Sequence, residues 1–191
     1  CQQGLEVSVT RELNKESTMI HSLKGKIPDT KKAIFIAWNA EVVGEVYLGQ
    51  DSSIWFSVTA RGDIAPIYIG DRTNIQDNTV LHVDTDVPLR LGNNITIGHS
   101  AVLHACTIGD NCLIGMGAIV LTHAEIGEES LVGAGALVTE QKKFSPRSLI
   151  VGSPARSIAT LTDTDLEKIK ANAERYIKRG REFAAELEEV D

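Results

Sequence analysis

The sequence predicts an all-β solenoid, a coil of three short strands per turn, that ends in a C-terminal α-helix. Aliphatic residues recur every six positions through the middle of the chain, and glycine often follows the aliphatic residue. A stripe of apolar residues at helical spacing occupies the end of the chain. A period of six fits neither an amphipathic helix, whose period is 3.6, nor an alternating strand, whose period is two.

The six-residue period begins at Ile36, is interrupted by two gaps and ends at Val138. Each aliphatic side chain is expected to point into a triangular core, and stacked coils, about six of them, would bury a core that no single repeat could bury alone. Glycine frees the backbone at the bends, and the Asn and Asp residues after several glycines tolerate the left-handed conformation that such corners need. The seventeen repeat positions are Ile36, Val42, Leu48, Ile54, Ala60, Ile69, Ile75, Leu81, Leu91, Ile97, Leu103, Ile108, Ile114, Val120, Ile126, Val132 and Val138.

These repeats, from about Ile34 to Val151, resemble the hexapeptide repeats of the left-handed parallel β-helix family. The resemblance implies left-handed winding, an exception to the right-handed crossover preference. The stretch "VGSPARSI", which ends at Ile158, resembles the exit motif of such proteins. The expected segments are an N-terminal tail or expression remnant at 1–18, the left-handed β-helix at 19–155 and a C-terminal helical segment at 156–191.

The helical segment carries its own start signal and an apolar stripe. Thr164 and Glu167 form a candidate capping box, and Gly180 is expected to weaken or bend the helix. We expect the helix to pack along the β-helix or against a neighbouring subunit. The stripe consists of Leu166, Ile169, Ala173, Tyr176, Ile177, Ala184 and Leu187.

Composition limits the possible partners. The net charge of −7 and the pI near 5.3 argue against a nucleic-acid binder, which would usually carry a basic patch. No run of about 18 apolar residues is present, so no membrane span is expected. The odd count of 3 cysteines, without a CxxC pair, suggests no disulfide framework and favours a cytoplasmic location, with Cys106 and Cys112 buried as small hydrophobes.

The first residues share no pattern with the repeats. Met19 is a candidate natural start, and the first 30 residues lack the apolar core of a secretory signal. An N-terminal Cys1 as the mature end of a lipoprotein is the less favoured alternative.

Two of the five histidines are expected to lie side by side. If three hexads form one turn, His82 and His104 occupy the same outward position on adjacent coils, about 4.8 Å apart, which suits two imidazoles converging on one metal. His99 follows Ile97 by two places, nearly a full triangle side from His104. Five extended residues span roughly 16 Å, far beyond the ~2.0–2.1 Å of a zinc–nitrogen bond.

One chain is therefore not expected to bring all three rings to one ion. If subunits pack around a threefold axis, His99 of one subunit would face His82 and His104 of the next, giving three equivalent interfacial sites. The alternative is that these are unrelated polar residues on a solenoid surface. His21 and His123 have no such register and are interpreted as structural or surface residues.

Three stretches, "ARGD", "NIQDNTVLH" and "GHSAVLH", together resemble the γ-class carbonic anhydrases and their bacterial homologues. The resemblance implies a zinc homotrimer with metal ligands shared across subunits, with iron or cobalt as alternative metals. It also implies that Arg61 and Asp77 pair across subunits, that Gln76 orients the attacking hydroxide, and that Tyr176 corresponds to a site tyrosine of shorter family members. The matching positions are Arg61, Asp63, Asn74, Gln76, Asp77, His82, His99 and His104.

The expected reaction is the reversible hydration of carbon dioxide to bicarbonate. Three neutral imidazoles on zinc leave an open position for water, whose pKa is about 7 on zinc in carbonic anhydrases. The archetype of the class has an acidic loop between its first two histidines, whereas this chain has only "VDTDVP", and Ile64 stands where the archetype has an additional acid. Asp84 or Asp86 either relays protons or caps a short turn. We therefore expect low activity.

Two other classes of function compete with this one. Hexapeptide-repeat proteins include acyltransferases, and relatives of the γ class include acyl-CoA thioesterases, so the fold does not fix the function. A hexapeptide acetyltransferase would typically use one catalytic histidine and need no trio of ligands, so the three-histidine set favours zinc. A catalytically silent assembly subunit is the third class.

Overall fold

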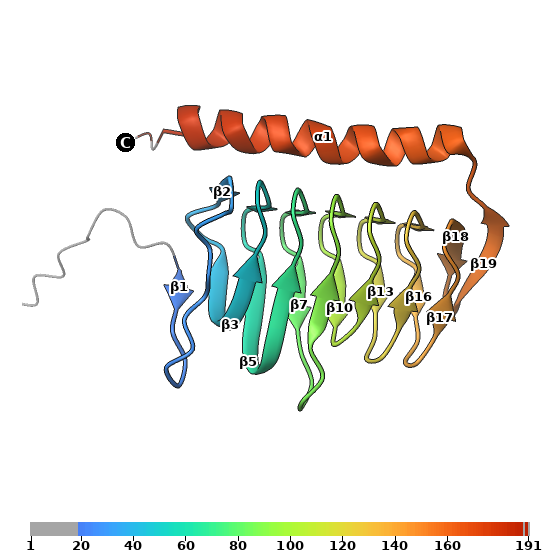
Figure 1. Ribbon diagram of the computed structural model, residues 1–191, viewed down its shortest axis with the longest axis horizontal. Coiled ribbons are helices and arrows are strands. Elements are labelled where there is room, and N and C mark those ends of the chain that lie inside the picture. Colours follow the sequence, from blue (N-terminus) through green and yellow to red (C-terminus); the bar gives the residue numbers. More distant parts are fainter. Residues whose placement is uncertain (1–18, 189, 191) are drawn as a thin grey trace, which may run out of the picture.

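The computed structural model describes residues 19–188 and residue 190. The tail expected at 1–18 lies outside the described residues. The chain winds into a parallel β-solenoid with one helix, α1 (Asp163–Glu186), lying along it, as expected for a left-handed β-helix of hexapeptide repeats (Figure 1).

One face of the solenoid is a sheet of seven parallel strands, one from each coil, so the solenoid has seven coils rather than the six expected. An eighth strand, β19, pairs with the last of them in antiparallel orientation. The strands, in their spatial order, are β2 (Phe35–Ile36), β4 (Ser53–Ile54), β6 (Asn74–Ile75), β9 (Thr96–Ile97), β12 (Leu113–Ile114), β15 (Leu131–Val132), β18 (Ser148–Gly152) and β19 (Ala155–Thr160).

The other two faces form one continuous sheet of 11 strands, because the long strand β5 (Thr59–Ile69) pairs with β7 at its start and with β8 at its end. The second face carries β7 (Val80–His82), β10 (Val102–His104), β13 (Ile119–Val120) and β16 (Leu137–Val138). The third face carries β8 (Leu89–Leu91), β11 (Thr107–Ile108), β14 (Glu125–Ile126) and β17 (Lys143–Phe144). The first coil adds β1 (Ile20–His21) and β3 (Glu41–Leu48).

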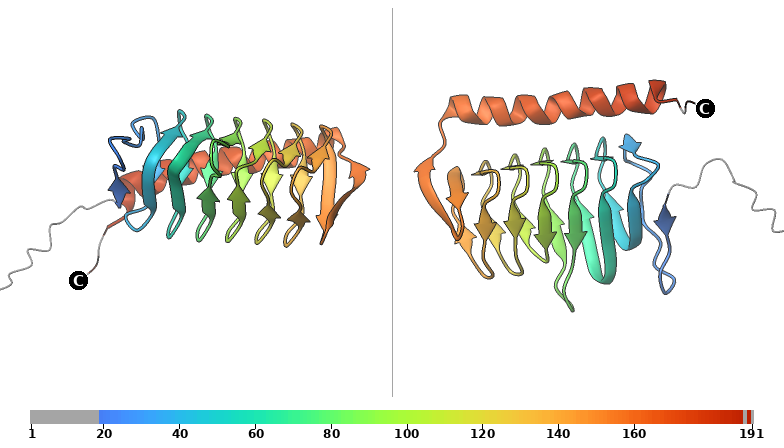
Figure 2. Two further views of the ribbon diagram at one scale, coloured as in Figure 1. Left: turned by 90° about the horizontal axis from the view of Figure 1, so that it is seen from below. Right: turned by 180° about the vertical axis from the view of Figure 1, so that it is seen from behind.

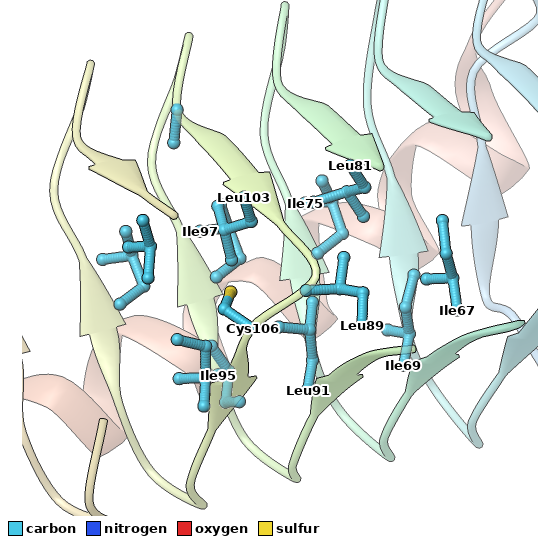
Figure 3. Close-up of a cluster of buried hydrophobic side chains, with 14 of the residues drawn as sticks. Ile67, Ile69, Ile75, Leu81, Leu89, Leu91, Ile95, Ile97, Leu103 and Cys106 are labelled. Carbon is cyan, nitrogen blue, oxygen red and sulfur yellow. The ribbon is translucent and has the colours of Figure 1, made fainter. Parts of the chain in front are cut away.

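The repeat positions fill the core as predicted. Ile75 pairs with Ile97, and Leu81 pairs with Leu103, so the same hexad position stacks from coil to coil. Of the seventeen positions, all but the half-buried Ile36 are buried. Figure 3 shows six of these side chains in the interior of successive coils: Ile69, Ile75, Leu81, Leu91, Ile97 and Leu103. Burying this aliphatic column is the main source of stability of the solenoid.

The corners adopt the left-handed conformation at more residue types than the sequence indicated. Asn94 (φ 55°) and Asn111 (φ 56°) adopt this conformation, as predicted. Arg72 (φ 57°) and Glu129 (φ 56°) adopt it too, at the equivalent corners of other coils. The backbone N–H of Arg72 donates to the carbonyl of Gln50 on the preceding coil at 2.7 Å. Such hydrogen bonds between coils hold the corner whatever the side chain, so residue type alone underpredicts these conformations.

The junction between the solenoid and α1 differs from the expectation of a helical segment from residue 156 onward. The chain first turns back as β19, which is antiparallel to β18. The helix then begins with Thr162 as its N-cap and Asp165 as the capping-box partner, two residues before the predicted Thr164 and Glu167. The backbone N–H of Thr162 donates to Asp165 at 3.1 Å, and hydrogen bonds from Thr162 hold the pKa of Asp165 below its usual value.

The helix packs along the first face of the solenoid, running back over β9, β6, β4 and β2 (Figures 1 and 2). Its buried residues are Leu166, Ile169, Ala173, Ile177 and Gly180, and the first four belong to the predicted stripe. This packing brings residues from the end of the chain against strands from its first half.

Cys106 and Cys112 are buried free thiols, as predicted, and burial raises the pKa of each to about 12. Among the residues that the structure describes, no helix is both long and apolar enough to cross a membrane.

Candidate metal centre

His82 and His104 converge on the second face of the solenoid. Their backbones pair directly across β7 and β10, which confirms the predicted register. The two ring centroids are 5.1 Å apart, and His82 Nδ1 lies 3.1 Å from His104 Nε2. The two imidazoles therefore turn one nitrogen each toward the other.

The remaining nitrogen of each ring is held by an oxygen of the same chain. His82 Nε2 lies 3.1 Å from Asp63 Oδ1, and His104 Nδ1 lies 2.9 Å from Thr122 Oγ1. Asp63 also accepts from the guanidinium of Arg61. Burial alone would raise the pKa of Asp63, but hydrogen bonds from His82 and Arg61 outweigh burial and lower it. We call Arg61, Asp63, His82, His104 and Thr122 the His82 half-site.

The donor set of this half-site fits two ligands of a metal ion. Zinc–nitrogen bonds of ~2.0–2.1 Å at tetrahedral angles place two ligand nitrogens roughly 3.3 Å apart. The separation of 3.1 Å between His82 Nδ1 and His104 Nε2 is close to that value. Metal-ligating histidines almost always bond their second nitrogen to a carboxylate, carbonyl or water, which fixes the tautomer. Asp63 and Thr122 occupy that place here.

A second cluster forms where the first face ends. His99 Nδ1 lies 2.9 Å from Asp77 Oδ2, and Gln76 Nε2 donates to Asn74 Oδ1 at 3.1 Å. The pairing of β6 with β9 stacks these two coils, so the cluster comes from adjacent turns. We call Asn74, Gln76, Asp77, His99 and Tyr176 the Gln76 half-site.

Tyr176 joins this half-site from α1. Its ring packs edge-on against Trp55, with the centroids 5.5 Å apart, and Trp55 lies one coil before Gln76. Burial raises the pKa of Tyr176, Arg179 lowers it and the nearby Asp77 carboxylate raises it, with a net increase. The phenol therefore stays protonated at neutral pH and can donate a hydrogen bond.

The two half-sites lie on different faces of one chain, separated by the corner at Asn78 (φ 60°). Within residues 19–188 and 190, no group of three His, Cys, Asp or Glu side chains could hold a metal ion. His82, His99 and His104 therefore form no common site in the single chain. A site with all three ligands needs residues of a second chain.

The strands that carry His82 and His104 also expose aliphatic side chains. Val80, Val102, Ile119 and Leu137 stack in register across the second face. Val80 is 39% exposed and Ile119 is 36% exposed. We call these four residues the apolar ladder. An aliphatic surface beside polar anchors is typical of a protein interface.

The short loop between β7 and β8 projects below the coils (Figure 1). Asp84 accepts from the backbone N–H of Thr85 at 2.7 Å, and it exchanges backbone hydrogen bonds with Val87. Asp86 takes the left-handed conformation at the tip, with φ 59°. Of the two interpretations left open for this loop, the turn-capping one describes Asp84 in this structure.

Sequence reasoning missed three polar residues of these clusters. Thr122 could have been found as the polar residue next to the histidine column, one coil beyond His104. Thr96 and Asn172 connect β9 to α1 by a hydrogen bond of 3.2 Å between residues 76 positions apart. The signal for Asn172 was an amide between apolar positions of the helical stripe, but its partner depends on how the helix docks.

This chain is similar to a family of repeat proteins and to several known proteins. Residues 105–140 match the family model described as bacterial transferase hexapeptide (six repeats). The chain is 42% identical over 167 residues to a carbonic anhydrase of Geobacillus kaustophilus, covering 87% of this chain and 92% of that protein. It is 36% identical over 184 residues to the mitochondrial gamma carbonic anhydrase 2 of Arabidopsis thaliana, covering 93% of this chain and 66% of that protein.

A solved structure also resembles this chain over most of its length. The crystal structure of a hexapeptide transferase family protein from Anaplasma phagocytophilum superposes with a TM-score of 0.82 at 39% identity, covering 87% of this chain and 98% of that chain.

Proposed function

This chain belongs to the γ carbonic anhydrase family, and from that membership we propose that it catalyses the reversible hydration of carbon dioxide to bicarbonate at a zinc ion, with iron or cobalt as alternative metals. The observation that carries the proposal is the His82–His104 pair, whose facing nitrogens lie 3.1 Å apart while Asp63 and Thr122 hold the other two nitrogens. Hydrogen bonding of the second nitrogen to an oxygen is typical of metal-ligating histidines.

We further propose that the active unit is a homotrimer in which His99 of one subunit completes the His82 half-site of the next. Two features support this. The ligand set is split between two faces of each chain, and the apolar ladder beside His82 gives the second face a surface suited to association. Arg61 would then pair with Asp77 of the neighbouring subunit as well as with Asp63 of its own.

Each residue of the two half-sites would have its own role in the reaction. Zinc, when bound, makes water a nucleophile at neutral pH. Asp63 and Thr122 keep His82 and His104 in the tautomers that present Nδ1 and Nε2 as ligands. Gln76 orients the nucleophile toward carbon dioxide, Asn74 holds Gln76, and the neutral phenol of Tyr176 offers a donor at the edge of the site.

Thr122→Ala is expected to weaken zinc binding about tenfold, because His104 loses the oxygen that fixes its tautomer. Thr122→Ser, which keeps the hydroxyl, is expected to bind zinc nearly as tightly as the wild type. Competition with a chelator of known affinity measures both. Equal affinities for the alanine variant and the wild type would show that Thr122 has no part in the site.

Acyl transfer or acyl-CoA thioester hydrolysis on the same scaffold is the second candidate function. It is favoured by the structural similarity to a hexapeptide transferase family protein. Such a reaction would need at most one of the three histidines, and it leaves the anchored His82–His104 pair without a role.

Metal analysis of the purified protein, combined with assays of both reactions, tests the proposal. We expect close to one zinc, iron or cobalt ion per chain and carbon dioxide hydration that a strong chelator abolishes and added metal restores. Hydrolysis or transfer of acyl-CoA without any hydration would establish the second candidate instead.

A further inference from the structure

A chain of side-chain hydrogen bonds links helix α1 to Gln76. Asn172 Nδ2 on the helix donates to Thr96 Oγ1 at 3.2 Å, and Asn74 Nδ2 donates to the same oxygen at 3.0 Å. Asn74 Oδ1 in turn accepts from Gln76 Nε2 at 3.1 Å. At the outer end, Arg175 Nη2 donates to Asn172 Oδ1 at 2.9 Å. The path therefore runs from the surface of the helix to the amide of Gln76.

The direction of every amide in this path is fixed by two groups of unambiguous polarity. The carbonyl of Ile95 can only accept, and it lies 3.2 Å from Asn74 Nδ2, so that end of the Asn74 side chain is the NH2 group. The guanidinium of Arg175 can only donate, so Asn172 must turn its oxygen toward Arg175 and its NH2 group toward Thr96.

These constraints set the orientation of Gln76. Because Asn74 presents Oδ1 to Gln76, Gln76 must present its NH2 group to Asn74, and its Oε1 is directed away from Asn74. Gln76 Oε1 accepts no side-chain hydrogen bond from the part of the chain that the structure describes. Gln76 Oε1 is therefore an acceptor in the Gln76 half-site that can receive a hydrogen bond from a bound molecule.

The inner part of the path, from Thr96 to Gln76, is protected from water. Thr96 and Asn74 are each 2% exposed, and Gln76 is 4% exposed. A hydrogen bond lost at such a depth leaves an unpaired polar group that water cannot readily satisfy. Thr96 is the shared acceptor, so its hydroxyl couples the helix to the coil.

We propose that Asn172 and Thr96 are positioning residues, which fix the Gln76 amide with Oε1 as a hydrogen-bond acceptor toward the reacting nucleophile. This rests on the proposed function. A flipped Gln76 would present two donors instead of an acceptor, and it could not take a hydrogen bond from the nucleophile. The C-terminal helix therefore has a catalytic consequence in addition to covering the first face of the solenoid.

The test follows the Gln76 side chain directly. Protein labelled with ¹⁵N-glutamine shows the side-chain amide of Gln76 by NMR, and its proton exchange rate reports the hydrogen bond to Asn74. Asn172→Ala and Thr96→Val are expected to speed this exchange, and to lower kcat for carbon dioxide hydration with KM unchanged, each by about fivefold. Thr96→Ser is expected to restore most of both. Metal content and trimer stability are expected to stay at wild-type values.

Glu174→Gln is the matched control. Glu174 also links α1 to the solenoid, through Arg72, but that ion pair does not lead to Gln76. We expect this variant to leave both the Gln76 signal and kcat unchanged. If Thr96→Val fails to fold, Asn172→Ala gives the same readouts from the half-buried helix surface.

Two results would overturn the proposal. One is an unchanged Gln76 exchange rate in Asn172→Ala and in Thr96→Val, or in Asn172→Ala alone where Thr96→Val does not fold, whatever the activity. The other is an equal change in Glu174→Gln, which would show that loosening the helix is enough. If the wild type hydrates no carbon dioxide, the proposed function fails, and the ordering of Gln76 by Asn172 and Thr96 is still decided by NMR.

Discussion

Replacing His99 with alanine is expected to remove bound metal and to lower carbon dioxide hydration at least about a hundredfold, because the nucleophile forms at neutral pH only with the metal in place. His82→Ala is expected to do the same. The two histidines lie on different faces of one chain, so equal losses would show that both faces serve one site. Metal content by mass spectrometry and initial hydration rates measure the effect.

His21→Ala is the matched control, since His21 pairs with Glu41 at 3.3 Å outside both half-sites. We expect this variant to keep its metal and its activity. A His99→Ala protein with full metal content and a wild-type hydration rate would contradict the assignment of His99 as a ligand.

Gln76→Ala is expected to lower kcat about a hundredfold while metal content and trimer assembly stay intact. The side chain is buried and makes its hydrogen bond to Asn74 rather than to a ligand histidine, so its loss removes the orienting acceptor and leaves the ligand set in place. Gln50→Ala, on an exposed corner, controls for the loss of a glutamine. Loss of metal from Gln76→Ala would instead show that Gln76 supports the ligand set.

Arg61→Ala is expected to give the opposite pattern. Arg61 bonds Asp63, which holds His82, and it is the proposed partner of Asp77 in the next subunit. Without Arg61, the trimer should dissociate at protein concentrations at which the wild type stays assembled. It should lose bound zinc as it dissociates. Sedimentation over a range of concentrations checks this, and an Arg61→Ala trimer as tight as the wild type would refute the interfacial role.

The period of six was enough to predict the solenoid and the place of His82 beside His104, because stacking fixes which residues become neighbours. The same period could not predict the junction with α1. Strand β19 forms only because the chain turns back after Gly152, and the capping box then moves to Thr162. The capping box was therefore predicted two residues too late, because its position depends on where β19 ends.

The polar partners of the site were only partly predictable. Asp63 and Gln76 were identified through motifs, but the role of Thr122 depends on which atom of His104 faces it. The link between Asn172 and Thr96 joins residues 76 positions apart, and it exists because an apolar stripe docks the helix in one register. The repeat pattern contains no information about that docking.

The central claim, that each metal site is shared between two subunits, is tested most directly by mixing His82→Ala and His99→Ala chains. The two variants are unfolded together in equal amounts, refolded with zinc and assayed for hydration and metal content. Each shared site needs an intact face from each of two neighbours, so about one quarter of the wild-type sites and activity should return. Recovery no greater than that of either variant refolded alone would contradict the claim, because sites built within single chains cannot complement one another.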